Sequence, residues 1–160
     1  MTVTTHEIGL EGIDGLAGVD SLCLFVGNDE RPLKGTSGFV DWRLCGGLSR
    51  VLIKGFFKGE PDDWLLLPSQ GRVPPIRIFV AGLGPTGTLT AQRLGSALAG
   101  AARTLTRAKV EAVAFEIPGA GALDDQARVT ALSHHFLPGF KGSRVAILCD
   151  KGLGRLIPGR

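Results

Sequence analysis

The chain has 160 residues, of which 44% are apolar and 21% charged, and its formal net charge is +3. This composition is typical of a globular domain with its own core, and the 24 glycines follow no period, which excludes a collagen-like or linker chain. No apolar run reaches the roughly 18–20 residues that span a bilayer. The N-terminus lacks the basic and apolar regions of a signal peptide, so we expect a cytoplasmic protein without a membrane partner.

The first half of the chain predicts three strands and two helices, in the order strand, strand, helix, helix, strand: 3–8, 21–26, 37–45, 48–57 and 64–67. The run Ser21–Val26 (SLCLFV) is apolar throughout, which is typical of a central strand buried on both faces. Apolar residues recur at helical steps on both sides of Gly46 and Gly47, and this glycine pair predicts a break between the two helices.

The second half alternates strands with helices, at 76–80, 88–108, 110–117, 124–136 and 144–149. Thr86 or Thr88 is expected to cap the long helix, and Gly95 and Gly100 within it indicate close packing against the sheet. The strands at 64–67 and 76–80 can pair as a hairpin.

This alternation predicts an α/β fold with three layers, in which a mixed, mostly parallel sheet carries helices on both faces. Residues 1–150 are expected to form a single domain. The Gly- and Pro-broken segment 151–160 is expected to be a frayed tail.

Charge is divided unevenly along the chain. Residues 1–70 hold six Lys/Arg and ten Asp/Glu, whereas residues 71–160 hold twelve and five. The basic half could contact an anion, a nucleic acid or an acidic partner, or it could be an ordinary solvated face. Halves of opposite charge also suit self-association.

Side chains that could carry chemistry lack the partners that chemistry requires. Cys23, Cys45 and Cys149 are far apart and at no metal-ligand spacing, so we expect buried, reduced thiols. His134 and His135 have no nucleophile or carboxylate at a suitable spacing. The acidic pairs are expected in solvated turns, at 29–30 and 62–63, and at a helix start, at 124–125. We expect no catalytic residue, no metal and no cofactor.

Several short motifs resemble, in order and spacing, the N-terminal domain of the leucyl aminopeptidase (cytosol aminopeptidase) family. These motifs are Gly38–Trp42 (GFVDW), Gly46–Leu48 (GGL), Phe57–Glu60 (FKGE), Trp64–Pro68 (WLLLP), Ile76–Gly84 ending in AGLG, and Phe136–Gly142 (FLPGFKG). Ala81 stands where the family has Val. The resemblance implies a macro-domain-like α/β fold.

The family's chemistry belongs to a separate C-terminal domain, which supplies a Lys, several Asp and a Glu to a two-metal site. These 160 residues contain no counterpart of its N-T-D-A-E-G-R segment, and two-metal hydrolysis needs clustered carboxylates. We therefore expect a non-catalytic interaction or assembly module that self-associates or binds a protein partner. Nucleic-acid binding and a role as one subunit of a split peptidase are alternatives.

A further alternative is a macro-type module that binds ADP-ribose or a related nucleotide. Macro domains hold this ligand between glycine loops at the carboxyl ends of adjacent strands. Two glycine groups have such positions here, and their members are Gly82, Gly84, Gly87, Gly119 and Gly121. The first three have G-x-G-x-x-G spacing, but no acidic residue follows at the spacing of a dinucleotide fold. Tight turns are the competing interpretation of both groups.

Overall fold

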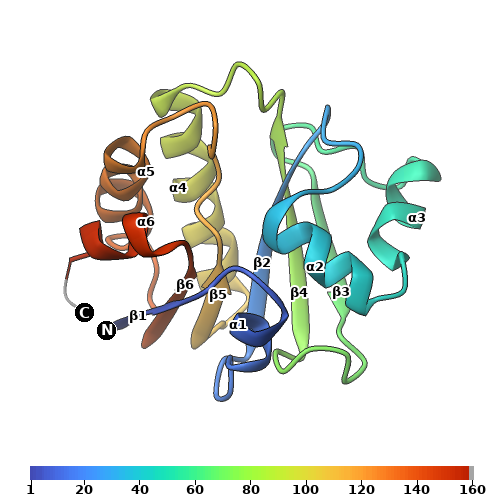
Figure 1. Ribbon diagram of the computed structural model, residues 1–160, viewed down its shortest axis with the longest axis horizontal. Helices are drawn as coiled ribbons and strands as arrows, with labels where there is room; N and C mark the ends of the chain where they lie inside the picture. Colours follow the sequence, from blue (N-terminus) through green and yellow to red (C-terminus); the bar gives the residue numbers. More distant parts are fainter. Residues whose placement is uncertain (159–160) are drawn as a thin grey trace.

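The computed structural model describes residues 1–158 and has one six-stranded sheet, in the order β1-β6-β5-β2-β4-β3 (Figure 1). The strands are β1 (Thr2–His6), β2 (Ser21–Gly27), β3 (Trp64–Pro68), β4 (Arg77–Gly84), β5 (Ala112–Phe115) and β6 (Arg144–Leu148). All neighbouring strands are parallel except β3 and β4, which form an antiparallel pair. The predicted mixed, mostly parallel sheet and its hairpin are confirmed.

Helices cover both faces of this sheet (Figure 1). One face carries α1 (Leu10–Asp14), α2 (Gly35–Arg43) and α3 (Gly47–Ile53). The other carries α4 (Ala91–Arg107), α5 (Asp125–Ala131), the π-helix η1 (Leu132–Phe136) and α6 (Lys151–Leu156). Each face has its own buried apolar cluster, as a three-layer fold requires. Within residues 1–158, no helix has the length and apolarity to cross a bilayer.

Four phenylalanines link the sheet to η1 in the larger cluster. The ring centroids of Phe25 and Phe115 are 5.8 Å apart, those of Phe115 and Phe136 4.6 Å, and those of Phe136 and Phe140 5.3 Å. Aromatic pairs at these separations add to the stabilisation from burial alone. The series fixes η1 against β2 and β5.

Asp20, the residue before β2, joins the amino ends of three strands. Its carboxylate accepts hydrogen bonds from the Arg77 guanidinium (3.0 Å) and from the amides of Glu111 (3.0 Å) and Ala112 (2.8 Å). Its carbonyl accepts from the amides of Ile76 and Arg77. β2, β4 and β5 are therefore held together at this end by one residue.

Two of these strands, β2 and β5, separate toward their carboxyl ends. β2 pairs with β4 from Ser21 to Gly27, but with β5 only at Ser21 and Leu22. Beyond Leu22, β2 has no strand partner on its β5 side. The sheet is therefore tight at its amino edge and open between β2 and β5 at its carboxyl edge.

Gly82 and Gly84 of the first glycine motif lie in a strand and not in a loop, in contrast to the prediction, whereas Gly87 lies in the turn after β4. β4 continues through Gly82 to Gly84, where the Gly82 amide donates to the Asp63 carbonyl and the Gly84 amide to the Gly59 carbonyl. A Cβ atom at Gly82 would lie 1.8 Å from the Glu60 carbonyl oxygen. Gly82 is thus required because segment 59–63 crosses directly over the strand.

Both chain ends also differ from the prediction. The short helix α1 was not predicted, because five residues that include Gly12 carry no helical pattern. The expected frayed tail forms α6 instead: the Asp150 carboxylate caps the helix through the Leu153 amide (2.8 Å), and Leu153 is buried. The final residues of that predicted tail, 159–160, lie outside the described residues.

The details of α4 correct two further expectations. The Thr90 side chain, rather than Thr86 or Thr88, caps the helix by accepting from the Arg93 amide. Gly95 packs against His135 of η1 and not against the sheet, since a Cβ there would lie 2.8 Å from the His135 ring. Gly100 faces open space, with nothing closer than 3.8 Å to such an atom.

This difference between two glycines of one helix predicts different responses to alanine. Gly100→Ala should raise the free energy of unfolding by up to about 1 kcal/mol, because alanine has the higher helix propensity and meets no neighbour. Gly95→Ala should be stabilised less, because its methyl group must displace the His135 ring. Urea unfolding of both variants is the measurement, and equal stabilisation at the two positions would contradict the packing described for Gly95.

The Asp20 hydrogen bonds predict a specific sensitivity to acid. Burial raises the pKa of Asp20, but the hydrogen bonds from Ser21, the Ala112 amide and Arg77 outweigh it, so the pKa is lower than usual. A carboxyl with a lowered pKa stabilises the fold above its unfolded pKa of about 4, and this contribution is lost as the pH falls through the folded value.

Asp20→Asn should therefore cost roughly 1–3 kcal/mol at pH 7, because donors to the carboxylate lose their acceptor. It should also flatten the dependence of unfolding free energy on pH below about pH 4. Urea unfolding between pH 2.5 and 7 tests both effects. A variant as stable as the wild type at pH 7 would contradict this role of Asp20.

Candidate functional site

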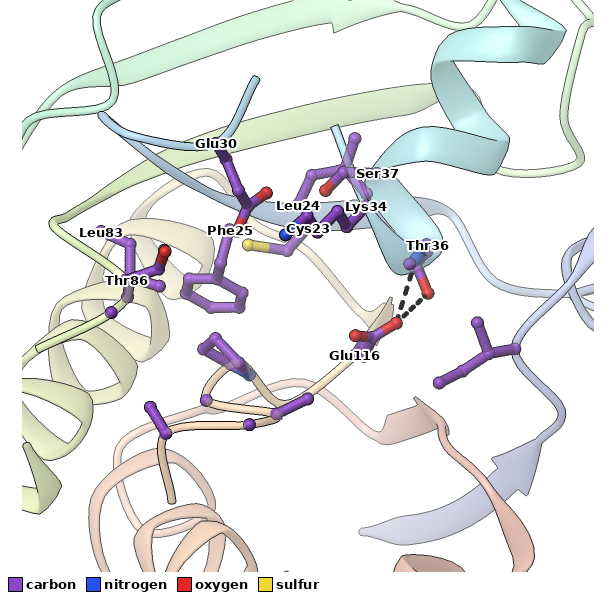
Figure 2. Close-up of a pocket in the computed structure, with 18 residues that line it drawn as sticks. Cys23, Leu24, Phe25, Glu30, Lys34, Thr36, Ser37, Leu83, Thr86 and Glu116 are labelled. Carbon is purple, nitrogen blue, oxygen red and sulfur yellow. Dashed lines mark hydrogen bonds between the residues drawn. The ribbon is translucent and has the colours of Figure 1, made fainter. Parts of the chain in front are cut away.

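A cavity of about 500 Å³ lies at the carboxyl ends of β2 and β5 (Figure 2). Its position follows from the sheet, because the two strands diverge there and no side chain from a strand between them fills the gap. The chain leaves β2 toward the β4 side and leaves β5 toward β6, so this is a topological switch point, where open α/β sheets bind ligands. Its volume is within the usual range for small-molecule sites.

Three segments form the walls of the cavity. They are the loop after β2 with the start of α2, the turn after β4, and the glycine-rich loop after β5. Their lining residues include Phe25, Glu30, Lys34, Thr36, Thr86, Gly87, Glu116, Gly119, Ala120 and Gly121. Figure 2 shows the labelled Glu30, Phe25 and Glu116 side chains around the same space.

Asp29 ties the loop after β2 to the turn after β4. Its carboxylate accepts hydrogen bonds from the Thr86 amide (3.0 Å), the Thr86 hydroxyl (2.8 Å) and the Gly87 amide (3.5 Å). The hydrogen bond from the Thr86 amide is the largest of the effects that lower the pKa of Asp29. This bridge closes one side of the cavity.

Arg128 holds the start of the glycine-rich loop by hydrogen bonds to its backbone. The side chain lies on α5, is buried, and donates to the carbonyls of Ile117 and Pro118 and to the Asp125 carboxylate. The N-terminus of α5 is capped by Asp124, which accepts from the Ala127 amide (2.7 Å), as the acidic pair at 124–125 predicted. The loop is therefore fixed at its base by α5.

Glu116 reaches across the cavity floor to the N-terminus of α2. Its Oε1 atom accepts hydrogen bonds from the amide (3.0 Å) and the hydroxyl (2.8 Å) of Thr36, which is buried (Figure 2). The carboxylate thus meets the partial positive charge of the helix start. The loop after β5 and the helix after β2 are connected by this contact.

Glu30 adds a second carboxylate to the lining. Burial raises its pKa most strongly, and the negative charges of Asp29 and Glu116 raise it further, against smaller opposite effects from Lys34 and Arg31. Among the described lining residues the charged side chains are Glu30, Glu116 and Lys34. The cavity therefore has an acidic interior.

The predicted site residues divide into two groups. Gly87, Gly119 and Gly121 line the cavity, as the glycine-loop hypothesis requires. Gly82 and Gly84 are outside this lining, and their amides already donate to the carbonyls of segment 59–63.

The charged and hydroxyl residues of the cavity were not identified from the sequence. Glu30 was expected in a solvated turn, and Glu116 does not have the spacing of the acidic residue in a dinucleotide fold. Thr36 and Arg128 form no motif with either of them. Residues from three distant segments meet only in the fold, so no local spacing could have indicated them.

The remaining candidates lie elsewhere. His134 and His135 are exposed on η1. Cys23 and Cys149 are buried as expected, and burial raises the pKa of the Cys23 thiol, but Cys45 is exposed, in contrast to the prediction. Within residues 1–158, no group of three or more His, Cys, Asp or Glu side chains is placed to hold a metal ion.

The sheet order and the cavity at its switch point define an α/β domain of the macrodomain type. The macrodomain of Mycobacterium tuberculosis DarG is similar, with a TM-score of 0.69 and 15% identity, over 93% of this chain and 99% of that one. A Trypanosoma brucei macrodomain in complex with ADP has a TM-score of 0.67 and 8% identity, over 96% of this chain and 66% of that one. At these identities the likeness shows the fold.

Within this class, the sequence matches the model of the cytosol aminopeptidase family, N-terminal domain, over residues 22–139. The chain belongs to this family, which confirms the resemblance seen in its motifs. A mutant of tomato leucine aminopeptidase is similar with a TM-score of 0.62 and 17% identity, over 98% of this chain and 34% of that one. The chain thus spans about a third of that relative's length. No curated protein matches the sequence.

The acidic interior predicts that Glu30 destabilises the fold when it is ionised. Because its pKa is raised in the folded state, the folded protein binds this proton more readily than the unfolded chain, so the penalty applies above the folded pKa and fades as the pH falls through it. Glu30→Gln should therefore be more stable than the wild type at pH 7, with a smaller difference at pH 4. Urea unfolding at the two pH values measures this, and a less stable variant at pH 7 would contradict it.

Proposed function

We propose that this domain is a protein interaction and assembly module that pairs with a second copy of the chain. The observation that carries the proposal is that most of the exposed large apolar side chains belong to one stretch of the chain, which forms α2, α3 and the edge strand β3. Of the eight large apolar side chains that are exposed in the described part of the chain, six lie between residues 39 and 76. We call them the α2–β3 flank: Phe39, Trp42, Ile53, Phe56, Leu66 and Ile76.

The exposure of this flank is large. Trp42 is 68% exposed, Ile53 83% and Phe56 79%. Covering one such side chain is worth about 1.5–3 kcal/mol, and exposed aromatic and large aliphatic groups are typical of association surfaces. α2, α3 and β3 lie together at the right of Figure 1, away from α5 and α6.

An open sheet edge adjoins these side chains. β3 is the last strand of the sheet and has a strand neighbour only on its β4 side. Its outer backbone groups are available for pairing, and edge strands commonly recruit another chain in this way. Leu66 is exposed in the middle of β3.

The charge of the flank favours a second copy as the partner. Residues 35–76 hold five Lys/Arg and four Asp/Glu. Two such nearly neutral surfaces can meet without strong like-charge repulsion, and self-complementary pairing is the commonest form of homo-oligomer. The family relation is also consistent with an assembly role, because in the tomato relative the same fold forms one part of a longer chain.

The proposal predicts that the 16.8 kDa chain forms a dimer whose population grows with protein concentration. Ile53→Asp should shift the protein to monomer, because a charge at an apolar interface must be desolvated. Leu156→Asp is the matched control, since Leu156 is an exposed apolar residue on α6, outside the flank. Light scattering coupled to size exclusion measures the mass. A wild type that stays monomeric at several hundred micromolar would contradict self-association.

A further inference from the structure

The N-terminus of α2 is already occupied by a carboxylate of the chain itself, that of Glu116. Oε1 of Glu116 accepts from the Thr36 amide and hydroxyl at 3.0 and 2.8 Å. Free amides at a helix start, together with the helix dipole, form a binding position for phosphate or carboxylate. Here that position opens into the cavity, and the Glu116 carboxylate occupies it.

The backbone around Glu116 is shaped to admit this carboxylate. Gly35, the first residue of α2, has a positive φ of 56°. A Cβ atom at Gly35 would lie 2.8 and 2.9 Å from the two Glu116 carboxylate oxygens. Any other residue at position 35 would be strained and would also press on Glu116. The absence of a side chain at Gly35 therefore leaves room for the Glu116 carboxylate at the N-terminus of α2.

A phosphate-bearing ligand would meet two obstacles in this cavity. Glu116 fills the helix start, where the amides and the helix dipole would otherwise attract an anion. Glu30 and Glu116 also outnumber Lys34 among the charged lining residues. Like charges brought together in a partly desolvated site repel strongly.

The glycine-rich loop would still suit an anion if this charge were absent. Within residues 1–158, the amides of Ala120 and Gly121 donate to no acceptor, and both residues line the cavity. Successive backbone amides of this kind form anion-binding concavities. The loop and the α2 N-terminus together would supply several donors.

We propose that Glu116 is the specificity-determining residue of the cavity. Its carboxylate takes the place that a ligand phosphate would occupy, so that the native cavity rejects nucleotide diphosphates. Removal of Glu116 exposes the α2 amides and creates a phosphate site beside the glycine-rich loop. This inference goes beyond the assembly proposal, because it concerns the cavity and not the α2–β3 flank.

The test is calorimetric titration of the full chain with ADP, ADP-ribose and inorganic pyrophosphate. Wild type should show no saturable binding at millimolar concentrations. Glu116→Ala should bind at least about tenfold more tightly, because a new charge-assisted hydrogen bond and the removal of one repulsion together exceed a single tenfold step. This added affinity should fall as salt is raised.

Two further variants make the result decisive. Asp150→Ala removes the same charge from another helix start, that of α6, outside the cavity lining, and should leave ligand binding as in the wild type. Glu116→Gln removes the charge but keeps an acceptor for Thr36, so its affinity should rise less than that of Glu116→Ala. Circular dichroism establishes that each variant is folded, and Glu116→Gln decides the question if Glu116→Ala does not fold.

Two results would overturn the proposal. One is a wild type that binds ADP or pyrophosphate as tightly as Glu116→Ala. The other is the absence of any increase in affinity in folded Glu116 variants. Neither result bears on the oligomeric state, so this inference and the assembly proposal fail independently.

Discussion

The hydrogen bonds to Asp20 are the constraint on which the rest of this structure depends. One carboxylate and one carbonyl fix the amino ends of β2, β4 and β5, which are the three strands at the middle of the sheet. Asp20 joins β2 and β5 at their amino ends, and the strand pairing between these two stops after two residue pairs. The cavity is the direct consequence, since strands that stayed paired would leave no space between them.

Charge distinguishes this cavity as much as its shape does. Its volume and its position at the switch point suit a small molecule, and the glycine-rich loop supplies backbone donors. However, the Glu116 carboxylate offsets the partial positive charge at the N-terminus of α2, and Glu30 adds a second carboxylate to the lining. The same fold occurs in a macrodomain in complex with ADP, but fold alone does not define a ligand, because the side chains that line a cavity also decide what it binds.

The cavity and the α2–β3 flank are different parts of the molecule, yet α2 contributes to both. Thr36 at its start meets Glu116, while Trp42 near its end is exposed on the flank. The family relation gives this arrangement a context, because the same fold forms about a third of a longer aminopeptidase chain.

The sequence by itself determined the strands, the main helices, the mixed sheet and the family, because these depend on local periodicity and on short motifs. The run 21–26 indicates a buried strand, and Gly46-Gly47 marks the break between α2 and α3, whatever surrounds them. The role of Gly82 was decided by tertiary structure, since only the crossing of segment 59–63 shows why no side chain fits there. The same is true of α6, whose short apolar pattern is stabilised by burial of Leu153 against the core.

The acidic cavity was likewise decided by the tertiary structure alone. Glu30 and Thr36 follow β2, whereas Glu116 follows β5 and is 80 residues from Thr36, so no recognisable spacing links them. Their chemistry depends on distances of about 3 Å across the sheet edge. Those distances exist only after the strands have paired, because a sequence records neighbours along the chain and a charged site is made by neighbours in space.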